Sequence, residues 1–232
     1  MKIGILQTGQ APDGLRGAHG DYPDFFQRLL AGRGLDFRNY HVEALEFPDT
    51  VRDADGWLIT GSRHGAYEDH PFIAPLEAFI RDAYAASVPL VGICFGHQII
   101  AQALGGKVEK YASGWSIGAQ DYDFGGETLT LNAWHQDQVT QRPPVAEVAA
   151  TNGFCENAAL IYPGHAYTVQ AHPEFDDAFV NGLIETRARG VVPDDLQERA
   201  RARMGGRRDN AVIADRIADF FHAMQTARQG AA

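Results

Sequence analysis

The clearest chemical signal in the sequence is a cysteine, Cys94, that stands between Gly92 and Gly96. An apolar run ends just before it and a helical pattern begins just after it. In such a strand-to-helix elbow the nucleophile sits in strained backbone geometry, and small residues two positions away on each side let strand and helix pass closely. The helix N-terminus also offers free N–H groups and a positive dipole end, which favour a thiolate and can hold an oxyanion. The pattern therefore predicts a nucleophilic thiol rather than an inert buried cysteine.

A thiolate nucleophile needs a base, and the base needs a group that orients it. Among nine histidines, His172 stands out because it follows an apolar run, residues 167–169, and precedes a helical pattern. In a parallel sheet, residues just past the carboxyl ends of neighbouring strands converge on one crevice. We therefore expect His172 at the same edge as Cys94, with Glu174 placed to accept the other ring proton. His-Pro-Glu alone would better suit a surface turn, and the elbow is what favours catalysis.

The elements that must position these residues alternate in the first half of the chain. Apolar runs predict strands over residues 2–8, 35–42, 56–60 and 88–93, and helical spacing predicts helices over 22–30, 71–86 and 96–104. Apolar strands separated by helices indicate a parallel sheet covered on both faces.

After residue 106 the pattern changes to short strands joined by turns. We expect them over residues 107–111, 116–122, 127–134, 148–150, 159–162 and 167–171. Gly125-Gly126 is the expected hairpin turn. Helical patterns follow from residue 176, through 179–184 and 212–221. Between them, the stretch 187–208 contains seven arginines, which we interpret as a solvated helix face and a loop.

Three segments, taken together, resemble the class I glutamine amidotransferase family: residues 92–98 (GICFGHQ), 104–106 (LGG) and 170–175 (QAHPEF). The resemblance covers about residues 1–190 and is greatest to stand-alone proteins similar to the amidotransferase part of GMP synthase, including γ-glutamyl peptidases. It implies a flavodoxin-like, three-layer α/β fold with a mixed, mainly parallel sheet and the site at its carboxyl edge. A catalytic domain over 1–190 and a C-terminal helical extension over 191–232, packed on the same domain, are expected.

The resemblance also implies roles for individual residues. Cys94 would attack the γ-carbonyl of glutamine, His172 would be the acid and base, and Glu174 would orient His172. The backbone N–H of Phe95 and one in the Gly61-Ser62 turn would form the oxyanion hole; which N–H of that turn points inward stays open, because the family often has Gly-Gly-Pro here.

Three further residues are implied in substrate binding. Gln98 matches a position that helps to seat the polar end of the substrate. Trp134 and His135 match a segment that borders the glutamine pocket, where relatives often read Ser-His-Gly-Asp. We interpret His135 as a pocket-wall or structural residue rather than as a second catalytic histidine.

The composition limits the possible partners. Twenty basic and 30 acidic residues give a net charge of −10, which argues against a nucleic-acid-binding surface. No apolar run reaches the roughly 18 residues of a membrane helix. Two cysteines, Cys94 and Cys155, form no disulfide framework, so a reducing cytoplasm is expected. No metal site, phosphate-binding loop or cofactor is predicted.

The predicted function is cleavage of the γ-glutamyl amide bond of glutamine or a γ-glutamyl compound through a cysteine thioester. One alternative is an ammonia-donating subunit for a separate synthetase. Another is a catalytically silent binding or regulatory homologue, which the complete set of Cys94, His172 and Glu174 disfavours. The sequence indicates a small-molecule substrate and leaves the physiological amine and the oligomeric state open.

Overall fold

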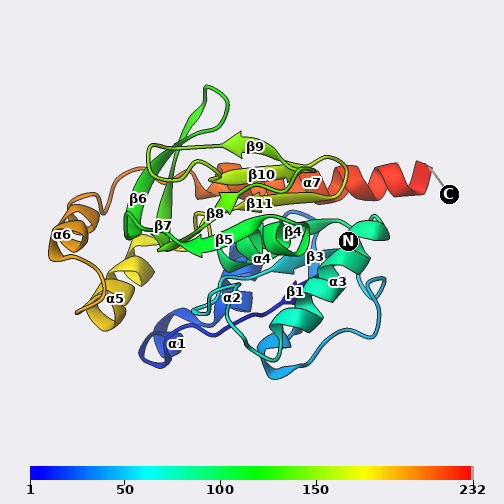
Figure 1. Cartoon of the computed structure of the whole chain (residues 1–232), viewed down its shortest axis with the longest axis horizontal. Helices are drawn as coiled ribbons and strands as arrows, with labels where there is room; N and C mark the ends of the chain where they lie inside the picture. The colour runs from blue at the N-terminus through cyan, green and yellow to red at the C-terminus, as the bar shows by residue number, and fades with distance from the viewer. Residues whose placement is uncertain (231–232) are drawn as a thin grey trace.

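The computed structural model describes residues 1–230 and is built around a seven-stranded sheet (Figure 1). Its strands, in spatial order, are β2 (Asp36–Tyr40), β1 (Lys2–Leu6), β3 (Gly56–Ile59), β4 (Leu90–Ile93), β11 (Ala166–Val169), β10 (Ala159–Tyr162) and β9 (Glu147–Ala150). The first five are parallel, and β10 and β9 are antiparallel to their neighbours. The predicted mixed, mainly parallel sheet is confirmed.

Helices cover both faces of this sheet. On one face α3 (Ile73–Ala85) and α4 (Phe95–Ala103) bury their apolar sides against the strands. On the other face lie α2 (Tyr22–Leu29) and the C-terminal helix α7 (Asn210–Gly230). The strands alternate between the two cores: in β3, Trp57 and Ile59 face the first core and Leu58 the second. The three-layer architecture and the C-terminal helix are therefore confirmed.

Two small antiparallel pairs stand beside the main sheet. The hairpin of β6 (Ser116–Asp123) and β7 (Thr128–His135) turns at Gly125 and Gly126, whose positive φ values suit the predicted turn. The other pair joins β5 (Lys107–Lys110) to β8 (Asp137–Gln141). We did not predict β8 as a strand, because its sequence, DQVTQ, is mostly polar.

Three further helices gather at one end of the molecule: α1 (Asp13–His19), α5 (Asp177–Arg187) and α6 (Asp194–Ala202) (Figure 1). Their buried side chains share a third core with part of the β6–β7 hairpin. A short 3₁₀ helix, η1 (Val42–Ala44), follows β2. Helix α1 was absent from our sequence prediction, since Gly14 and Gly17 disfavour helix; Leu15 secures it by packing against α5.

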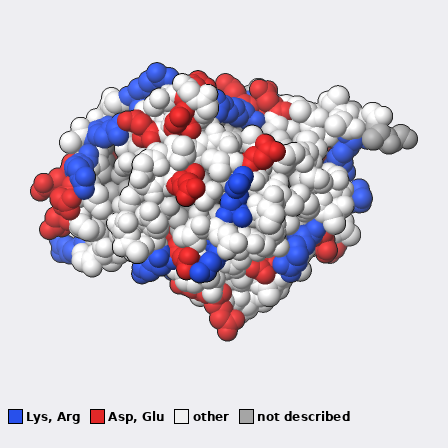
Figure 2. All heavy atoms as spheres, turned by 45° about the horizontal axis from the view of Figure 1, so that its top comes forward, with Lys and Arg blue, Asp and Glu red and all other residues white. Residues whose placement is uncertain are grey.

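The arginine-rich stretch 187–208 is partly an ion-paired seam rather than only a solvated face. Arg203 pairs with Asp121 on β6 at 2.8 Å, and Arg208 pairs with Asp177 on α5 at 2.7 Å. These contacts tie α6 and the following loop to the hairpin and to α5. Figure 2 shows basic and acidic side chains interspersed over one face of the molecule.

Within residues 1–230, no helix has both the length and the apolar character needed to cross a membrane. The proposed division at residue 190 remains a prediction, and residues 231–232 of the predicted extension lie outside the described residues.

The register of the central strands decides which residues meet at the carboxyl edge. Ile59 lies beside Gly92, so Gly61 lies level with Cys94. Ile93 lies beside Val169, so the chain leaving β11 passes directly next to Cys94. Segments far apart in sequence therefore converge on one crevice, as expected at the carboxyl edge of a parallel sheet.

Candidate functional site

Cys94 occupies the tight turn between β4 and α4. Its backbone has φ 52° and ψ −102°, a conformation that non-glycine residues rarely adopt. Both flanking glycines are required by close backbone approach. A Cβ on Gly92 would lie 2.4 Å from the carbonyl oxygen of Gly96, and a Cβ on Gly96 would lie 2.3 Å from that of Ile59. The expected elbow geometry is present, and it projects Cys94 from the end of the strand.

His172 is fixed from three directions. Its backbone N–H donates to the carbonyl oxygen of Asn132 on β7 at 2.8 Å. Its ring stacks on Phe175, with centroids 4.0 Å apart and an angle of 3° between the planes. Nδ1 lies 2.7 Å from Oε1 of Glu174. Because Glu174 accepts at Nδ1, the other ring nitrogen, Nε2, is left to face a reacting group.

His172 and Glu174 interact strongly because both side chains are buried. The side chain of His172 is 5% exposed and that of Glu174 is 1% exposed. Burial lowers the pKa of His172, but the negative charges of Glu174 and Cys94 outweigh it and raise this pKa to about 10. The surroundings therefore favour an imidazolium between a carboxylate and a sulfur.

Cys155 is a useful contrast within the same chain. It is buried, 1% exposed, and burial raises the pKa of its thiol to about 12. No elbow surrounds it, and its backbone N–H is bound by the side chain of Asn152. A thiolate at this position is therefore strongly disfavoured.

The turn after β3 faces the cysteine and histidine. A Cβ on Gly61 would lie 3.1 Å from Cε1 of His172 and 3.9 Å from Cβ of Cys94. The carbonyl oxygen of Gly61 accepts hydrogen bonds from the hydroxyls of Thr8 and Thr60, at 3.1 and 3.0 Å. In a trans peptide the N–H points opposite to the carbonyl. The N–H of Ser62 is therefore directed away from Thr8.

Within residues 1–230, the backbone N–H groups of Gly61, Ser62 and Phe95 donate no hydrogen bond. Phe95 is the first residue of α4, where N–H groups have no partner inside the helix. The hydroxyl of Ser62 is used elsewhere, since it donates to the carbonyl oxygen of Thr8 at 2.7 Å.

A cavity of about 390 Å³ opens onto these groups. The lining includes six of the residues singled out from the sequence: Cys94, His172, Ser62, Gln98, Trp134 and His135. Gly61, Phe95 and Glu174 are not among the lining residues. Gly61 faces His172 and Cys94, and Glu174 contacts Nδ1 of His172.

The predicted substrate-binding residues differ in what their polar groups can do. The amide nitrogen of Gln98 donates to the carbonyl oxygen of Asp137 at 2.9 Å and to Oε1 of Gln170 at 3.1 Å, so it holds the cavity wall together. His135 is buried, and burial followed by the charge of His172 lowers its pKa to about 3. A neutral His135 agrees with a wall residue. Trp134 lies 6.2 Å from Trp115, centroid to centroid, and both rings line the cavity.

Sequence reasoning missed several residues that shape this cavity. Tyr22 lies close enough for Cys94 and Glu174 to add to the effect of burial in raising its pKa. Lys110 and Arg187 bring positive charge to the lining. Asn132 anchors His172 from a strand 40 positions earlier. No local spacing signals Lys110 or Asn132, because tertiary packing alone brings them to the site.

Comparison with known proteins identifies a family whose model matches this chain. The model of the family described as "Glutamine amidotransferase class-I" matches residues 26–178. A glutamine amidotransferase-like protein of Schizosaccharomyces pombe is 28% identical, covering 94% of this chain and 98% of its own. Gamma-glutamyl peptidase 4 of Arabidopsis thaliana is 28% identical, covering 80% of this chain and 81% of its own.

The chain is also similar to part of a larger enzyme. A glutamine-hydrolysing GMP synthase of Cupriavidus pinatubonensis is 28% identical over 77% of this chain but only 38% of its own length. Among solved structures, a glutamine amidotransferase from Methylobacillus flagellatus superposes with a TM-score of 0.72 at 23% identity, covering 98% of this chain and 94% of the other. That likeness supports the fold.

Proposed function

Because the chain belongs to the class I glutamine amidotransferase family, we propose that it hydrolyses the γ-glutamyl amide bond of glutamine or of a γ-glutamyl compound through a thioester on Cys94. The observation that carries this proposal is the elbow cysteine beside a histidine whose Nδ1 lies 2.7 Å from a buried carboxylate. A strained nucleophile, a base and an orienting acid are the three parts that covalent acyl transfer needs.

In the proposed reaction the Sγ of Cys94 attacks the γ-carbonyl carbon and forms a tetrahedral oxyanion. The imidazolium of His172 gives its proton to the leaving nitrogen, the C–N bond breaks, and ammonia or an amine departs. His172, now neutral, takes a proton from water, which attacks the thioester and releases glutamate with regeneration of the thiolate. Glu174 is the positioning residue that holds the imidazole and stabilises its charged form.

We propose that the oxyanion is held by the backbone N–H of Phe95 and one from the Gly61-Ser62 turn. Both segments offer N–H groups with no partner in the described chain, and Thr8 fixes the turn so that its carbonyl is bound on the other side. Donors already aimed at the developing charge cost no rearrangement during the reaction, and each typically supplies about 3 kcal/mol.

The remaining cavity residues are proposed to select the substrate. Gln98, Trp134 and His135 form walls, whereas Lys110 and Arg187 add positive charge that suits the carboxylate of a glutamyl group. Since turnover requires a free thiol, we expect the protein to work in a reducing compartment such as the cytoplasm.

A second candidate is an ammonia-donating subunit for a separate synthetase, which the similarity to GMP synthase supports. A donor of this kind would depend on its partner to complete the oxyanion hole. In this chain, however, hydroxyls of the same chain already bind the turn carbonyl. This favours a hydrolase that needs no partner over a dependent donor and over a silent binding homologue.

The experiment is release of glutamate from glutamine and a panel of γ-glutamyl amides by the purified chain, with no nucleotide or second protein. We expect turnover of at least one substrate, and none by Cys94→Ala. If the folded chain releases no glutamate from any substrate of the panel but does so when a synthetase is added, the chain is better explained as an ammonia-donating subunit.

A further inference from the structure

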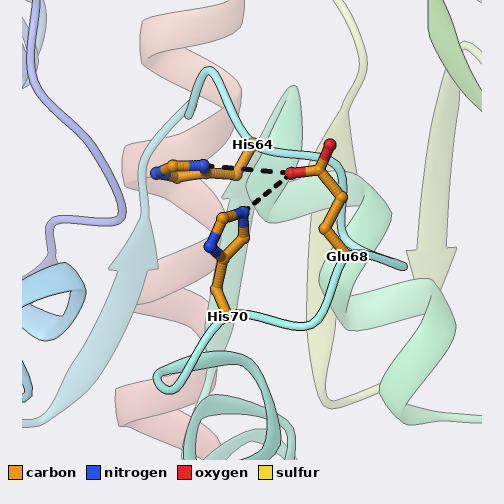
Figure 3. A group of neighbouring side chains, drawn as sticks. All are labelled: His64, Glu68 and His70. Atoms are coloured by element: carbon orange, nitrogen blue, oxygen red, sulfur yellow. Dashed lines mark hydrogen bonds and ion pairs between the residues drawn. The ribbon is translucent and has the colours of Figure 1, made fainter.

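A cluster of metal-ligating side chains lies in the loop between the Gly61-Ser62 turn and α3 (Figure 3). It consists of His64, Glu68 and His70, whose ligand atoms all lie within 4.8 Å of one another. Nε2 of His70 is 2.8 Å from Oε2 of Glu68, and Nδ1 of His64 is 3.9 Å from the same oxygen. Figure 3 shows the carboxylate of Glu68 facing both rings.

A fourth residue, Glu43 from η1, binds the far side of this cluster. Its Oε1 lies 2.9 Å from Nε2 of His64. When a carboxylate accepts the Nε2 proton of a histidine, Nδ1 becomes the nitrogen with a free lone pair. That lone pair is on the side of Glu68. Histidines that bind metals are commonly held in this way by a carboxylate on the other ring nitrogen, which fixes the tautomer and increases ligand basicity.

The rings are also held in place by packing. The rings of His64 and His70 lie 4.0 Å apart, centroid to centroid, and that of His70 stacks on Phe72 at an angle of 17°. Phe72 is buried, 2% exposed, so it offers a firm support. The side chain of His64 is 14% exposed, whereas those of His70 and Glu68 are 33% and 45% exposed, which leaves one side of the cluster open to water.

From these observations we propose that His64, Glu68 and His70 bind a divalent transition-metal ion of the zinc type, with water as the fourth ligand. Two imidazoles and one carboxylate are a ligand set that Zn²⁺ accepts at about 2.0–2.2 Å, in tetrahedral geometry. Ligand atoms around such an ion lie about 3.3 Å apart. The two distances from the histidine nitrogens to Oε2 of Glu68, 2.8 and 3.9 Å, bracket this value, and the third pair of ligand atoms lies within 4.8 Å.

The site would act on the loop that borders the cavity. His64 and Glu68 both line the cavity, and the backbone N–H of His64 donates to Oγ of Ser62 at 3.1 Å. A bound ion would therefore restrain the segment 61–70 as one unit. The inference concerns binding and does not depend on the proposed hydrolysis.

The test is titration of the full chain with Zn²⁺ by isothermal calorimetry after treatment with a chelator. Because a reactive thiol also binds zinc, the titration is made in the Cys94→Ala background. We expect one ion per chain with a Kd in the micromolar range or tighter. His64→Gln and His70→Gln, made in that background, should each weaken binding about 100-fold or more, whereas His222→Gln, a control on α7, should not.

Two further measurements separate a metal site from a hydrogen-bonded cluster. Glu43→Gln should weaken binding about 10–100-fold, as expected for a residue that orients a ligand. Co²⁺ should give the visible absorption of a tetrahedral ion, and this should disappear in His64→Gln. Melting curves in chelator show whether each variant is folded. The proposal would be overturned if Cys94→Ala did not bind Zn²⁺ with micromolar affinity. It would also be overturned if the folded His64→Gln and His70→Gln variants bound Zn²⁺ as tightly as the Cys94→Ala parent.

Discussion

The chemistry proposed for this chain depends on how the surroundings of His172 compensate for its burial. A histidine that is 5% exposed would ordinarily be neutral, yet Glu174 and the sulfur of Cys94 stabilise its charged form. His135 lies close by without such partners and has a pKa lowered to about 3. The pKa values of two buried histidines in one cavity are thus shifted in opposite directions, which supports different roles for them.

The first prediction distinguishes the roles of the individual residues of the proposed triad. Cys94→Ala and His172→Ala should each lower kcat by about 10⁴–10⁶-fold, because either change removes a group that makes or breaks bonds. Glu174→Ala should cost less, since it removes only the orienting group. Rates of glutamate release from the best substrate measure all three. Equal and small losses would argue against covalent catalysis.

The second prediction is a pH dependence of stability. The pKa of His172 is raised from about 6.5 to about 10 on folding, so its contribution to stability is complete below about pH 6.5 and is lost as the pH rises through about 10. In Glu174→Gln the carboxylate charge is missing and this contribution is smaller. The difference in free energy of unfolding between wild type and variant should therefore shrink between pH 7 and pH 10.5.

Urea unfolding at a series of pH values in that interval measures the difference directly. Contributions from groups that the substitution does not affect cancel between the two proteins. A difference that stays constant or grows with pH would show that Glu174 does not stabilise the imidazolium.

At the scale of the elements, the elbow between β4 and α4 is the part most directly predictable from sequence. Gly92 and Gly96 flank Cys94 because backbone atoms come within 2.4 Å of where their Cβ atoms would be, and so the spacing is visible in the sequence. The strands and helices leading to it are also local patterns. Their apolar runs and helical spacing predicted the sheet without any knowledge of partners.

Other parts of the structure could not be predicted from the sequence, for physical reasons. β8 is a polar segment that becomes a strand only through pairing with β5, and α1 contains glycines that tertiary packing overrides. The proposed metal ligands have the spacing His-x₃-Glu-x-His in a loop, and our sequence analysis predicted no metal site. Glu43, which binds Nε2 of His64, stands 21 positions earlier in the sequence.

A pair of glycine variants tests the elbow. Gly96→Ala should destabilise the fold by about 1–3 kcal/mol or more, because the new Cβ would lie 2.3 Å from the backbone oxygen of Ile59. Gly17→Ala is the matched control on the surface of α1, where nothing lies within 4 Å of the added atom. It should be neutral or stabilising by up to about 1 kcal/mol. Equal unfolding midpoints in urea would contradict the close approach.

At the scale of the whole molecule, the C-terminal helix α7 completes one face of the central sheet. Ile213, Ile217 and Phe221 are fully buried in the core shared with β1, β3 and β4. The residues predicted as an extension therefore pack in the same core as Cys94 and the central strands. The division at residue 190 remains a prediction.

A truncation tests this dependence. Removing residues 191–232 deletes those three side chains and exposes the surface that they cover. Burial of each side chain stabilises the fold by about 1.5–3 kcal/mol, and the sum is comparable to a typical free energy of unfolding of about 5–15 kcal/mol. The fragment 1–190 should lack a cooperative thermal transition by circular dichroism. A chain ending at His222, which keeps all three side chains, is the control and should remain folded. A fragment that melts like the full chain would refute this account.

The central claim is that Cys94 is the nucleophile for a γ-glutamyl group, and active-site labelling tests it most directly. The full chain is treated with a chloroketone or diazoketone analogue of glutamine, with and without excess substrate, and the modified peptide is identified by mass spectrometry. We predict that the label lies on Cys94, that substrate protects against it, and that Cys155, whose thiol pKa is raised to about 12, is unmodified. A label found mainly on Cys155, or one on Cys94 that no substrate of the panel reduces, would contradict the account.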